Sequence, residues 1–275
     1  MYTRIMHKRL LLAISAKKSP WMGVFVGITL WVTTWCGHAE TTPLTMPTLI
    51  IGTTQHYPPF AYMVSKGNFV GFEIELMEGI CQRIHVHCEY RPYIVSEFTT
   101  QLSAGNIDLA IGTIIIPSKP LPYYLFSLPY LESSAQFMAE KNSPISTPAD
   151  IKNKTVGVRK GTLYGGSMLG SLVRNIYANQ VKILEYPTMD EMLIALQNHK
   201  VDILFTNQAA VRYWLANDAN YKLVGPILPV GNGYGIMGKQ GQEALLEKIN
   251  QALLSMEGDD SYLQLYSKYF SENMK

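Results

Sequence analysis

The strongest constraint on the fold is an alternation of short apolar runs with amphipathic segments, which occurs in both halves of the chain. In the first half, Thr48–Gly52 and Ile107–Gly112 are apolar runs that end in glycine and have the length of buried strands. Apolar residues recur at four-residue steps over Gly71–Ile84, which predicts a helix between them. We also expect a strand and a short, Ser96-capped helix in this region: Val86–Arg91 and Glu97–Ala104. This β-α-β-α-β order predicts a parallel sheet with helices on both faces.

The second half repeats the pattern. Two similar segments, Leu102-x-x-Gly-Asn-Ile-Asp and Leu196-x-x-His-Lys-Val-Asp, each join the end of a helix to a strand at equivalent places. Further elements are expected in this order: a helix start at Thr147-Pro148 with Asp150, strands Thr155–Val158 and Val181–Glu185, helix Met189–Asn198 with a capping box at Thr188 and Glu191, strand Val201–Phe205, helix Gln208–Ala216, strand Tyr234–Met237, and helices Glu243–Ser255 and Asp260–Phe270. We therefore expect two similar α/β lobes with a small-molecule cleft between them.

The basic charge of the chain is concentrated at its N-terminus. Residues 1–39 hold five basic residues and no acid, whereas the remainder holds 18 basic and 21 acidic residues. A basic segment up to Lys18, an apolar run over Trp21–Trp35 and the small residues before Glu40 are typical of a secretory signal cleaved after Ala39. The run is shorter than the ~20 residues that span a bilayer, which favours cleavage over an uncleaved anchor. The acidic remainder gives no reason to expect nucleic-acid binding.

Two cysteines, Cys81 and Cys88, remain after cleavage of the predicted signal. An even number of cysteines in an exported chain predicts a disulfide, because the compartment is oxidising. The alternative is a zinc site that also uses His85 and His87, but the spacing lacks the paired C-x2-C ligands of structural zinc sites. We therefore favour the disulfide over the metal. The third cysteine, Cys36, stands where a lipidated cysteine would, but the bulky residue before it argues against a lipoprotein.

Several motifs, taken in order, resemble those of the family 3 periplasmic solute-binding proteins. The segment GFEIELMEGICQRI at Gly71–Ile84 resembles the family signature, and GTTQHYPPF at Gly52–Phe60 looks like its first ligand loop. The pair Gly112-Thr113, the segment Val156–Thr162 and the tail Tyr262–Phe270 also fit. Cys81 and Cys88 match a disulfide found in the lysine/arginine/ornithine-binding branch. The resemblance covers almost all of the mature chain.

The resemblance implies a two-lobed α/β fold of the type II periplasmic-binding-protein class, in which each lobe has a mostly parallel sheet flanked by helices. The first lobe would comprise residues 47–132 and 234–275, and the second residues 133–233. The implied function is that of a periplasmic receptor, which closes on a small polar solute by a hinge and delivers it to an inner-membrane ABC permease. We expect a monomer without cofactor, metal or nucleic acid.

The resemblance also implies the ligand-binding residues. Tyr57 would lie over the apolar or cationic part of the ligand, and Gly112 and Thr113 would form a loop whose backbone N–H groups and hydroxyl receive an anion. In the second lobe, Arg159 matches a contact position, and Thr162 would lie at a helix N-terminus suited to an anion. We regard Arg159 as an ordinary surface charge in the alternative interpretation.

The chain departs from the family pattern at charged positions. Members that bind α-amino acids normally carry an arginine eight residues after the glycine of the anion loop, where this chain has Pro120 preceded by Lys119. The acids that pair with ligand ammonium groups are replaced by Thr54 and Asn207. With two acceptors lost and Arg159 gained, a neutral or acidic amino acid, or an organic acid, is favoured over lysine or arginine.

Two other functions and two other residue pairs were weighed. Cyclohexadienyl-dehydratase-like enzymes use the same fold and need a cleft acid of tuned pKa, and sensory modules form a third class. Glu73 and Glu75 do not face each other on a helix, and their position in a first turn is explained by the helix dipole, so we interpret both as structural. His56, beside Tyr57, is interpreted as a solvated loop histidine.

Overall fold

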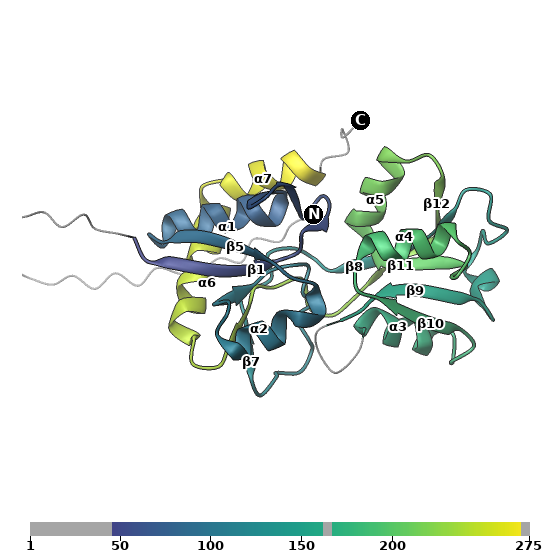
Figure 1. Ribbon diagram of the computed structural model, residues 1–275, viewed down its shortest axis with the longest axis horizontal. Coiled ribbons are helices and arrows are strands. Elements are labelled where there is room, and N and C mark those ends of the chain that lie inside the picture. The colour runs from purple at the N-terminus through teal and green to yellow at the C-terminus, as the bar shows by residue number, and fades with distance from the viewer. Residues whose placement is uncertain (1–45, 162–166, 271–275) are drawn as a thin grey trace, which may run out of the picture. The chain divides into compact units, whose positions relative to one another are not determined.

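The computed structural model describes residues 46–161 and 167–270. The predicted signal, its cleavage site and Cys36 lie outside the described residues, and so does Thr162. Over the described part the chain forms two five-stranded sheets and one small three-stranded sheet. Figure 1 shows the elements of the two large sheets, each with its own flanking helices. The predicted α/β class is confirmed.

The first large sheet has the strand order β5-β1-β6-β13-β7. Its strands are β1 (Thr48–Thr53), β5 (His87–Pro92), β6 (Leu109–Ala110), β7 (Tyr124–Phe126) and β13 (Met237–Lys239). β1 pairs in parallel with β5 and β6, as the β-α-β-α-β order predicts. β13 pairs antiparallel with β6 and β7, so a strand from the end of the chain completes this sheet.

The second large sheet has the order β10-β9-β11-β8-β12. Its strands are β8 (Ser134–Glu140), β9 (Thr155–Arg159), β10 (Lys182–Tyr186), β11 (Ile203–Asn207) and β12 (Tyr221–Pro229). β9 pairs in parallel with β10 and β11, whereas β8 pairs antiparallel with β11 and β12. Both sheets therefore have a parallel centre and two antiparallel pairings. The chain enters the second sheet between β7 and β8 and returns to the first between β12 and β13.

Helices flank both large sheets (Figure 1). In chain order they are α1 (Phe72–Arg83), α2 (Phe98–Ala104), α3 (Met168–Ile176), α4 (Met189–Gln197), α5 (Gln208–Asn217), α6 (Glu243–Gly258) and α7 (Ser261–Phe270), with 3-10 turns at Val95–Glu97 and Pro148–Ile151. The small sheet consists of β2 (His56–Tyr57), β3 (Ala61–Ser65) and β4 (Asn68–Val70). α1 begins after Gly71, whose φ of +128° and close approach to the Phe60 carbonyl, 2.3 Å from an added Cβ, exclude larger residues.

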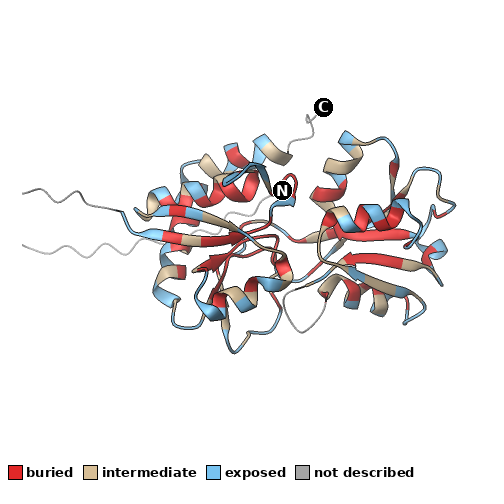
Figure 2. Cartoon of the chain, viewed as in Figure 1, coloured by how far each residue is buried: buried red, intermediate tan, exposed pale blue. Residues whose placement is uncertain are grey.

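The buried side chains follow the predicted periodicity. Figure 2 shows buried residues along the strands of both large sheets and on the inner faces of the helices. The four-residue repeat of α1 is wholly buried at Phe72, Leu76 and Ile80. In the second sheet, Phe137 and Phe205 lie with their ring centres 4.4 Å apart. Burial of these side chains, at about 25 cal/mol per Å² of apolar surface, is the main term that stabilises such sheets.

Some local predictions differ from the structure. Ser96 lies inside a 3-10 turn and does not cap α2; instead the Glu97 carboxylate accepts a hydrogen bond from the Ile94 N–H at 3.2 Å. The late strand lies at Met237–Lys239, three residues beyond its predicted start at Tyr234. The two antiparallel strands β8 and β12 and the small sheet were not predicted. The capping box at Thr188 is confirmed, since the Thr188 hydroxyl accepts from the Glu191 N–H at 3.2 Å.

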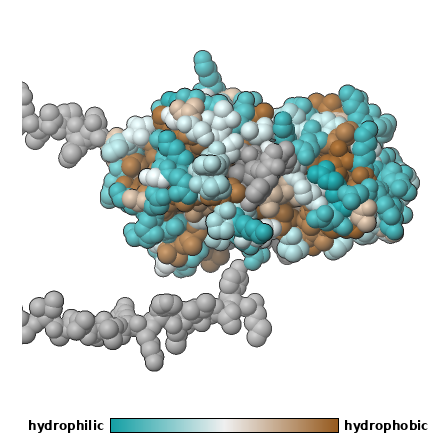
Figure 3. Space-filling view, turned by 90° about the horizontal axis from the view of Figure 1, so that it is seen from below, coloured by the Kyte–Doolittle hydropathy of each residue, from teal (hydrophilic) through white to brown (hydrophobic). Residues whose placement is uncertain are grey.

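The predicted disulfide between Cys81 and Cys88 is present, with Cα atoms 6.1 Å apart. It joins the last turn of α1 to the start of β5, and both cysteines are buried. Among the residues that the structure describes, no cluster of histidine, cysteine or acidic side chains is suited to a metal ion. Within the same part of the chain, no helix is long and apolar enough to cross a membrane. Figure 3 shows hydrophobic side chains in separate patches among hydrophilic ones on one face.

Candidate functional site

The cleft lies where segments of the two large sheets meet. A hollow of about 220 Å³ is lined by the loop after β1, by residues 92–95, by Arg159 at the end of β9 and by the start of α4. A smaller hollow of about 60 Å³ is lined by residues 113–115 and 167–169. Val95 and Arg159 line both. Because β9 and α4 belong to one sheet and β1 to the other, a solute in the larger hollow would contact both halves of the molecule.

Arg159 points into the cleft. Its Nη2 donates hydrogen bonds to the Gly112 carbonyl oxygen at 3.2 Å and to the Thr113 hydroxyl at 2.5 Å. Its guanidinium carbon lies 4.2 Å from the ring centre of Tyr57, which is a cation–π contact. Arg159 closes β9, whereas Gly112 and Thr113 follow β6, so these contacts join the two sheets. The interpretation of Arg159 as an ordinary surface charge is wrong.

Tyr57 forms the aromatic wall of the larger hollow. It is only 2% exposed, and its ring stacks on Phe60 with centres 5.7 Å apart. Its hydroxyl makes a hydrogen bond of 3.1 Å with the Thr206 hydroxyl, on β11 of the second sheet. The ring therefore has one face on the core, and Arg159 stacks on the ring as well. Thr54 lines the same hollow, and its hydroxyl oxygen has no partner among the described residues.

The Gly112-Thr113 loop is held from both sides. A Cβ on Gly112 would lie 2.9 Å from the Phe98 ring, which explains the glycine. The Thr113 N–H donates to Glu73 Oε1 at 2.6 Å, and the Thr113 hydroxyl donates to the Gly112 carbonyl oxygen at 2.8 Å. This differs from the expected loop with unpaired donors: the Thr113 N–H is already paired with a carboxylate, and its hydroxyl lies between the Gly112 carbonyl and Arg159.

Glu73 is the functional neighbour that sequence reasoning missed. Its side chain is completely buried, and Oε1 also accepts a hydrogen bond from the Tyr130 hydroxyl. Burial raises the pKa of Glu73 to about 7, although the hydrogen bonds from Tyr130 and Thr113 and the charge of Arg159 act in the opposite direction. Glu73 Oε2 has no hydrogen-bond partner within the described part of the chain. The residue therefore fixes the loop that Arg159 contacts.

Glu75, by contrast, lies at the surface of α1. Its carboxylate accepts from Lys268 at 2.7 Å and from the Tyr269 hydroxyl at 2.5 Å. The two acids were expected to share a helix-dipole role, but only Glu75 lies in the partly exposed position that this role implies. The signal that separates them is the helix face. Glu73 shares a face with the apolar positions Met77 and Ile80, at i+4 and i+7, whereas Glu75 precedes Glu78 and Gly79 at i+3 and i+4.

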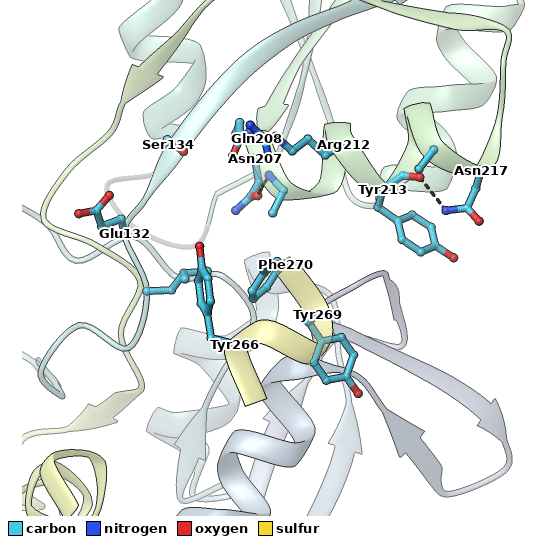
Figure 4. A pocket seen from close by; sticks show the side chains of 13 residues that line it. Glu132, Ser134, Asn207, Gln208, Arg212, Tyr213, Asn217, Tyr266, Tyr269 and Phe270 are labelled. Carbon is cyan, nitrogen blue, oxygen red and sulfur yellow. Dashed lines mark hydrogen bonds between the residues drawn. The ribbon is translucent and has the colours of Figure 1, made fainter. Parts of the chain in front are cut away.

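Asn207 ends the central strand β11 but does not line the hollow that contains Tyr57. Its Oδ1 accepts from the backbone N–H groups of Ala209 and Ala210, so it is the N-cap of α5. Its Nδ2 donates to the Tyr234 hydroxyl at 2.6 Å. Asn207 instead borders a separate cavity of about 500 Å³. Figure 4 shows this cavity between Arg212 and Tyr213 of α5 and the rings of Tyr266, Tyr269 and Phe270 of α7.

The remaining candidates lie elsewhere. Lys119 and Pro120 are exposed and are not among the described residues that line the two hollows at Arg159. His56 makes a contact of 2.7 Å with Asp190 at the start of α4, so it joins the two sheets at the rim of the larger hollow rather than standing free in solvent. The site thus brings together Thr54, Tyr57 and Arg159 with the Gly112-Thr113 loop.

Known proteins share both the sequence and the fold. The ABC transporter arginine-binding protein 1 of Escherichia coli (strain K12) is 27% identical over 226 residues, which are 80% of this chain and 90% of that protein. An arginine 3rd transport system periplasmic binding protein from Legionella pneumophila is 36% identical in its crystal structure, with a TM-score of 0.76 over 82% of this chain and all of that one. An ancestral arginine-binding protein bound to glutamine is 32% identical, with a TM-score of 0.71 over 82% and 98%. Residues 49–272 match the bacterial extracellular solute-binding proteins, family 3, and the chain belongs to this family.

Proposed function

We propose that this protein is the solute-binding receptor of an amino-acid ABC importer and that it binds its ligand in the hollow between Tyr57 and Arg159. The observation that carries the proposal is the position of Arg159. Its guanidinium, on the second sheet, reaches an aromatic ring and a glycine loop of the first. A solute held at this point contacts both halves of the protein, so its binding energy favours the closed arrangement.

The ligand contacts follow from the polar atoms that lack partners. Arg159 Nη1 is buried and, as far as the structure describes the chain, has no hydrogen-bond partner. A ligand carboxylate can accept a charge-assisted hydrogen bond from this nitrogen. The Thr54 hydroxyl, also unpartnered in the described part, lines the same hollow and can bond a ligand amino group or carboxylate oxygen. Tyr57 packs against the ligand's apolar part. Asn207 and Thr162 are second-lobe contacts only if closure tightens further around the ligand.

The ligand we propose is a neutral or acidic amino acid. The relatives named above are arginine-binding proteins, so homology alone favours a cationic ligand. The charges of this cleft favour the opposite, because a cation already stands at its centre and no acid replaces Thr54 or Asn207. An ancestral arginine-binding protein bound to glutamine supports the idea that this fold accommodates neutral amino acids. The local charge therefore outweighs the names of the relatives.

Hinge closure of two lobes is part of the proposal. We infer that residues 47–132 and 234–275 form one lobe and residues 133–233 the other. Support comes from the two chain crossings between the large sheets, at β7–β8 and β12–β13. Small-angle scattering should show compaction when the true ligand is added. An unchanged radius of gyration at saturation would argue against hinge closure.

Export to the periplasm is proposed from the N-terminal sequence. Family members are extracellular binding proteins, and we infer that the signal is cleaved after Ala39. Mass spectrometry of the periplasmic protein should give a chain that starts at Glu40. A lipid-modified Cys36 or an uncleaved chain would contradict this part of the proposal.

The enzyme alternative has one observation in its favour. Glu73 is a buried acid beside the cleft loop with a pKa near neutrality, as general acid–base chemistry requires. Its Oε1, however, is already bonded to the Thr113 N–H and the Tyr130 hydroxyl, which is the geometry of a structural acid. We therefore infer a binding protein without catalytic activity. Incubation with prephenate or arogenate tests this directly, and formation of an aromatic product at a catalytic rate would favour the enzyme.

The receptor proposal is tested by a ligand screen. Thermal-shift measurements with amino acids, polyamines and organic acids, followed by calorimetry, should identify at least one neutral or acidic amino acid with one binding site per chain. Absence of binding to every amino acid in the panel would overturn the proposal.

A further inference from the structure

The Arg159 side chain stands where a solute could otherwise lie. The two hollows of the cleft, about 220 Å³ and 60 Å³, both have Arg159 and Val95 in their walls. Arg159 therefore separates them. Without the atoms beyond its Cβ, the hollows would merge into one larger space that is bounded by Tyr57 and the Gly112-Thr113 loop.

Each contact of the guanidinium is one that a free guanidinium could make. The Tyr57 ring offers a π face at 4.2 Å, the Gly112 carbonyl oxygen accepts at 3.2 Å, and the Thr113 hydroxyl accepts at 2.5 Å. The buried Glu73 carboxyl, which bonds the N–H of the same Thr113, lies behind the loop and lends it negative character. These groups together form a receptor for a planar cation, and the chain itself fills it.

We propose that Arg159 is an internal occupant of the ligand cleft and determines its specificity: it takes the cation-binding position for itself, excludes cationic amino acids, and presents Nη1 to a solute that carries an anionic group. This inference rests on the proposed function and names its substrate class. A cationic side chain would have to displace the tethered guanidinium or lie beside a like charge. A carboxylate meets a buried donor that has no partner in the described part of the chain.

A purely structural arginine would look different. Buried donors and acceptors in native proteins are nearly always paired, and a guanidinium that only joined the two sheets would be expected to use all of its buried nitrogens. Here Arg159 Nη1, Glu73 Oε2 and the Thr54 hydroxyl all lack hydrogen-bond partners among the described residues. Three such atoms around one cleft indicate that a further molecule completes the arrangement.

The test is to remove the internal occupant and supply a free one. Calorimetry at pH 8 would compare L-arginine binding to the wild-type chain and to Arg159→Ala, with ethylguanidinium as the side-chain fragment. We expect L-arginine to bind Arg159→Ala at least about tenfold more tightly than wild type, which is within the range of a cation–π contact plus a charged hydrogen bond. A crystal structure of the complex should place the free guanidinium on the Tyr57 ring.

Matched variants separate the explanations. Lys160→Ala changes the net charge equally at the exposed neighbouring residue, and we expect no gain in L-arginine binding. Arg159→Lys keeps a cation in the cleft and should show no gain either. Arg159→Gln shortens the side chain and removes the charge, so it should show a gain and serves if Arg159→Ala does not fold, as judged by circular dichroism.

The outcomes are distinct from those of the receptor proposal. If neither Arg159→Ala nor Arg159→Gln gains L-arginine affinity, or if Lys160→Ala gains as much, the inference is overturned even when wild type binds other amino acids. Tight L-arginine binding by wild type that does not improve in Arg159→Ala also overturns it, although the protein would remain an amino-acid receptor. Failure of wild type to bind any amino acid would overturn the receptor proposal, whatever the variants bind.

Discussion

The ends of the two central strands, β6 and β11, stand at equivalent places in the two large sheets but have different surroundings. After β6, the Gly112-Thr113 loop is contacted by Arg159 from the other sheet and has unpartnered polar atoms around it, as far as the chain is described. After β11, Asn207 caps its own helix and donates to Tyr234, so both atoms of its amide are used. Polar residues at a strand end thus indicate a site only when their hydrogen-bonding capacity is left over.

The largest effect is expected at Glu73, which supports the β6 end. Its carboxyl keeps its proton to about pH 7 in the folded protein but releases it near 4.5 when unfolded. The folded state therefore binds more protons between these values, and stability should fall as pH rises from 4.5 to 7, by up to about 3 kcal/mol. Glu73→Gln keeps an acceptor for Thr113 and Tyr130 but cannot ionise, so this decline should disappear in urea unfolding measured across the window.

The control for Glu73 is Glu75→Gln, which removes an acid two residues away at the partly exposed surface of α1. This variant should retain the wild-type decline. An equal decline in wild type and Glu73→Gln would mean that the buried carboxyl does not titrate in this window, and it would remove Glu73 from the account of the β6 end.

Asn207 tests the β11 end. Asn207→Ala removes the cap of α5 and the donor to Tyr234, and we expect it to lower the free energy of unfolding by about 1–2 kcal/mol. Asn207→Asp retains the capping acceptor and should recover most of this stability. The added carboxylate should weaken an acidic ligand. A large loss of ligand affinity in Asn207→Ala without loss of stability would show that the β11 end is a binding site, contrary to the comparison drawn here.

The smallest effect is expected at the rim. His56 and Asp190 join the two halves at 2.7 Å, but their side chains are 50% and 43% exposed. Exposed ion pairs contribute about 0–1 kcal/mol. His56→Ala should therefore change ligand affinity by less than about fivefold, and Asp190→Ala should do the same. A larger loss in either variant, measured by calorimetry, would place the ligand at the rim rather than at Arg159.

Much of the fold could be predicted because periodicity reports burial. The spacing of Phe72, Leu76 and Ile80 located α1, and the apolar run at Thr48–Gly52 located β1. The antiparallel strands β8 and β12 were missed because their pairing depends on which strand the folded chain brings alongside them. β8 lies between β11 and β12, far from it in sequence. No local pattern carries that information.

The site was predictable in its residue types but not in its geometry. The sequence placed Arg159 at the end of a strand, but a strand end does not reveal whether a long side chain crosses a cleft. The same holds for the Gly112-Thr113 loop, whose N–H was expected to be unpaired and is held by Glu73. The burial of Glu73 was open to prediction, because Met77 and Ile80 share its helix face. The capping role of Asn207 follows from its place directly before α5.

The most direct test of the account compares two arginines that border different cavities. Arg159 borders the hollow with Tyr57, and Arg212 borders the larger cavity beside α7. Calorimetry would use the amino acid found by the thermal-shift screen on wild type, Arg159→Ala and Arg212→Ala. The account predicts that Arg159→Ala weakens binding by ~1.5–3 kcal/mol, the cost of losing a charged hydrogen bond, while Arg212→Ala changes it less than about twofold. Binding that is indifferent to Arg159→Ala but lost in Arg212→Ala would contradict it.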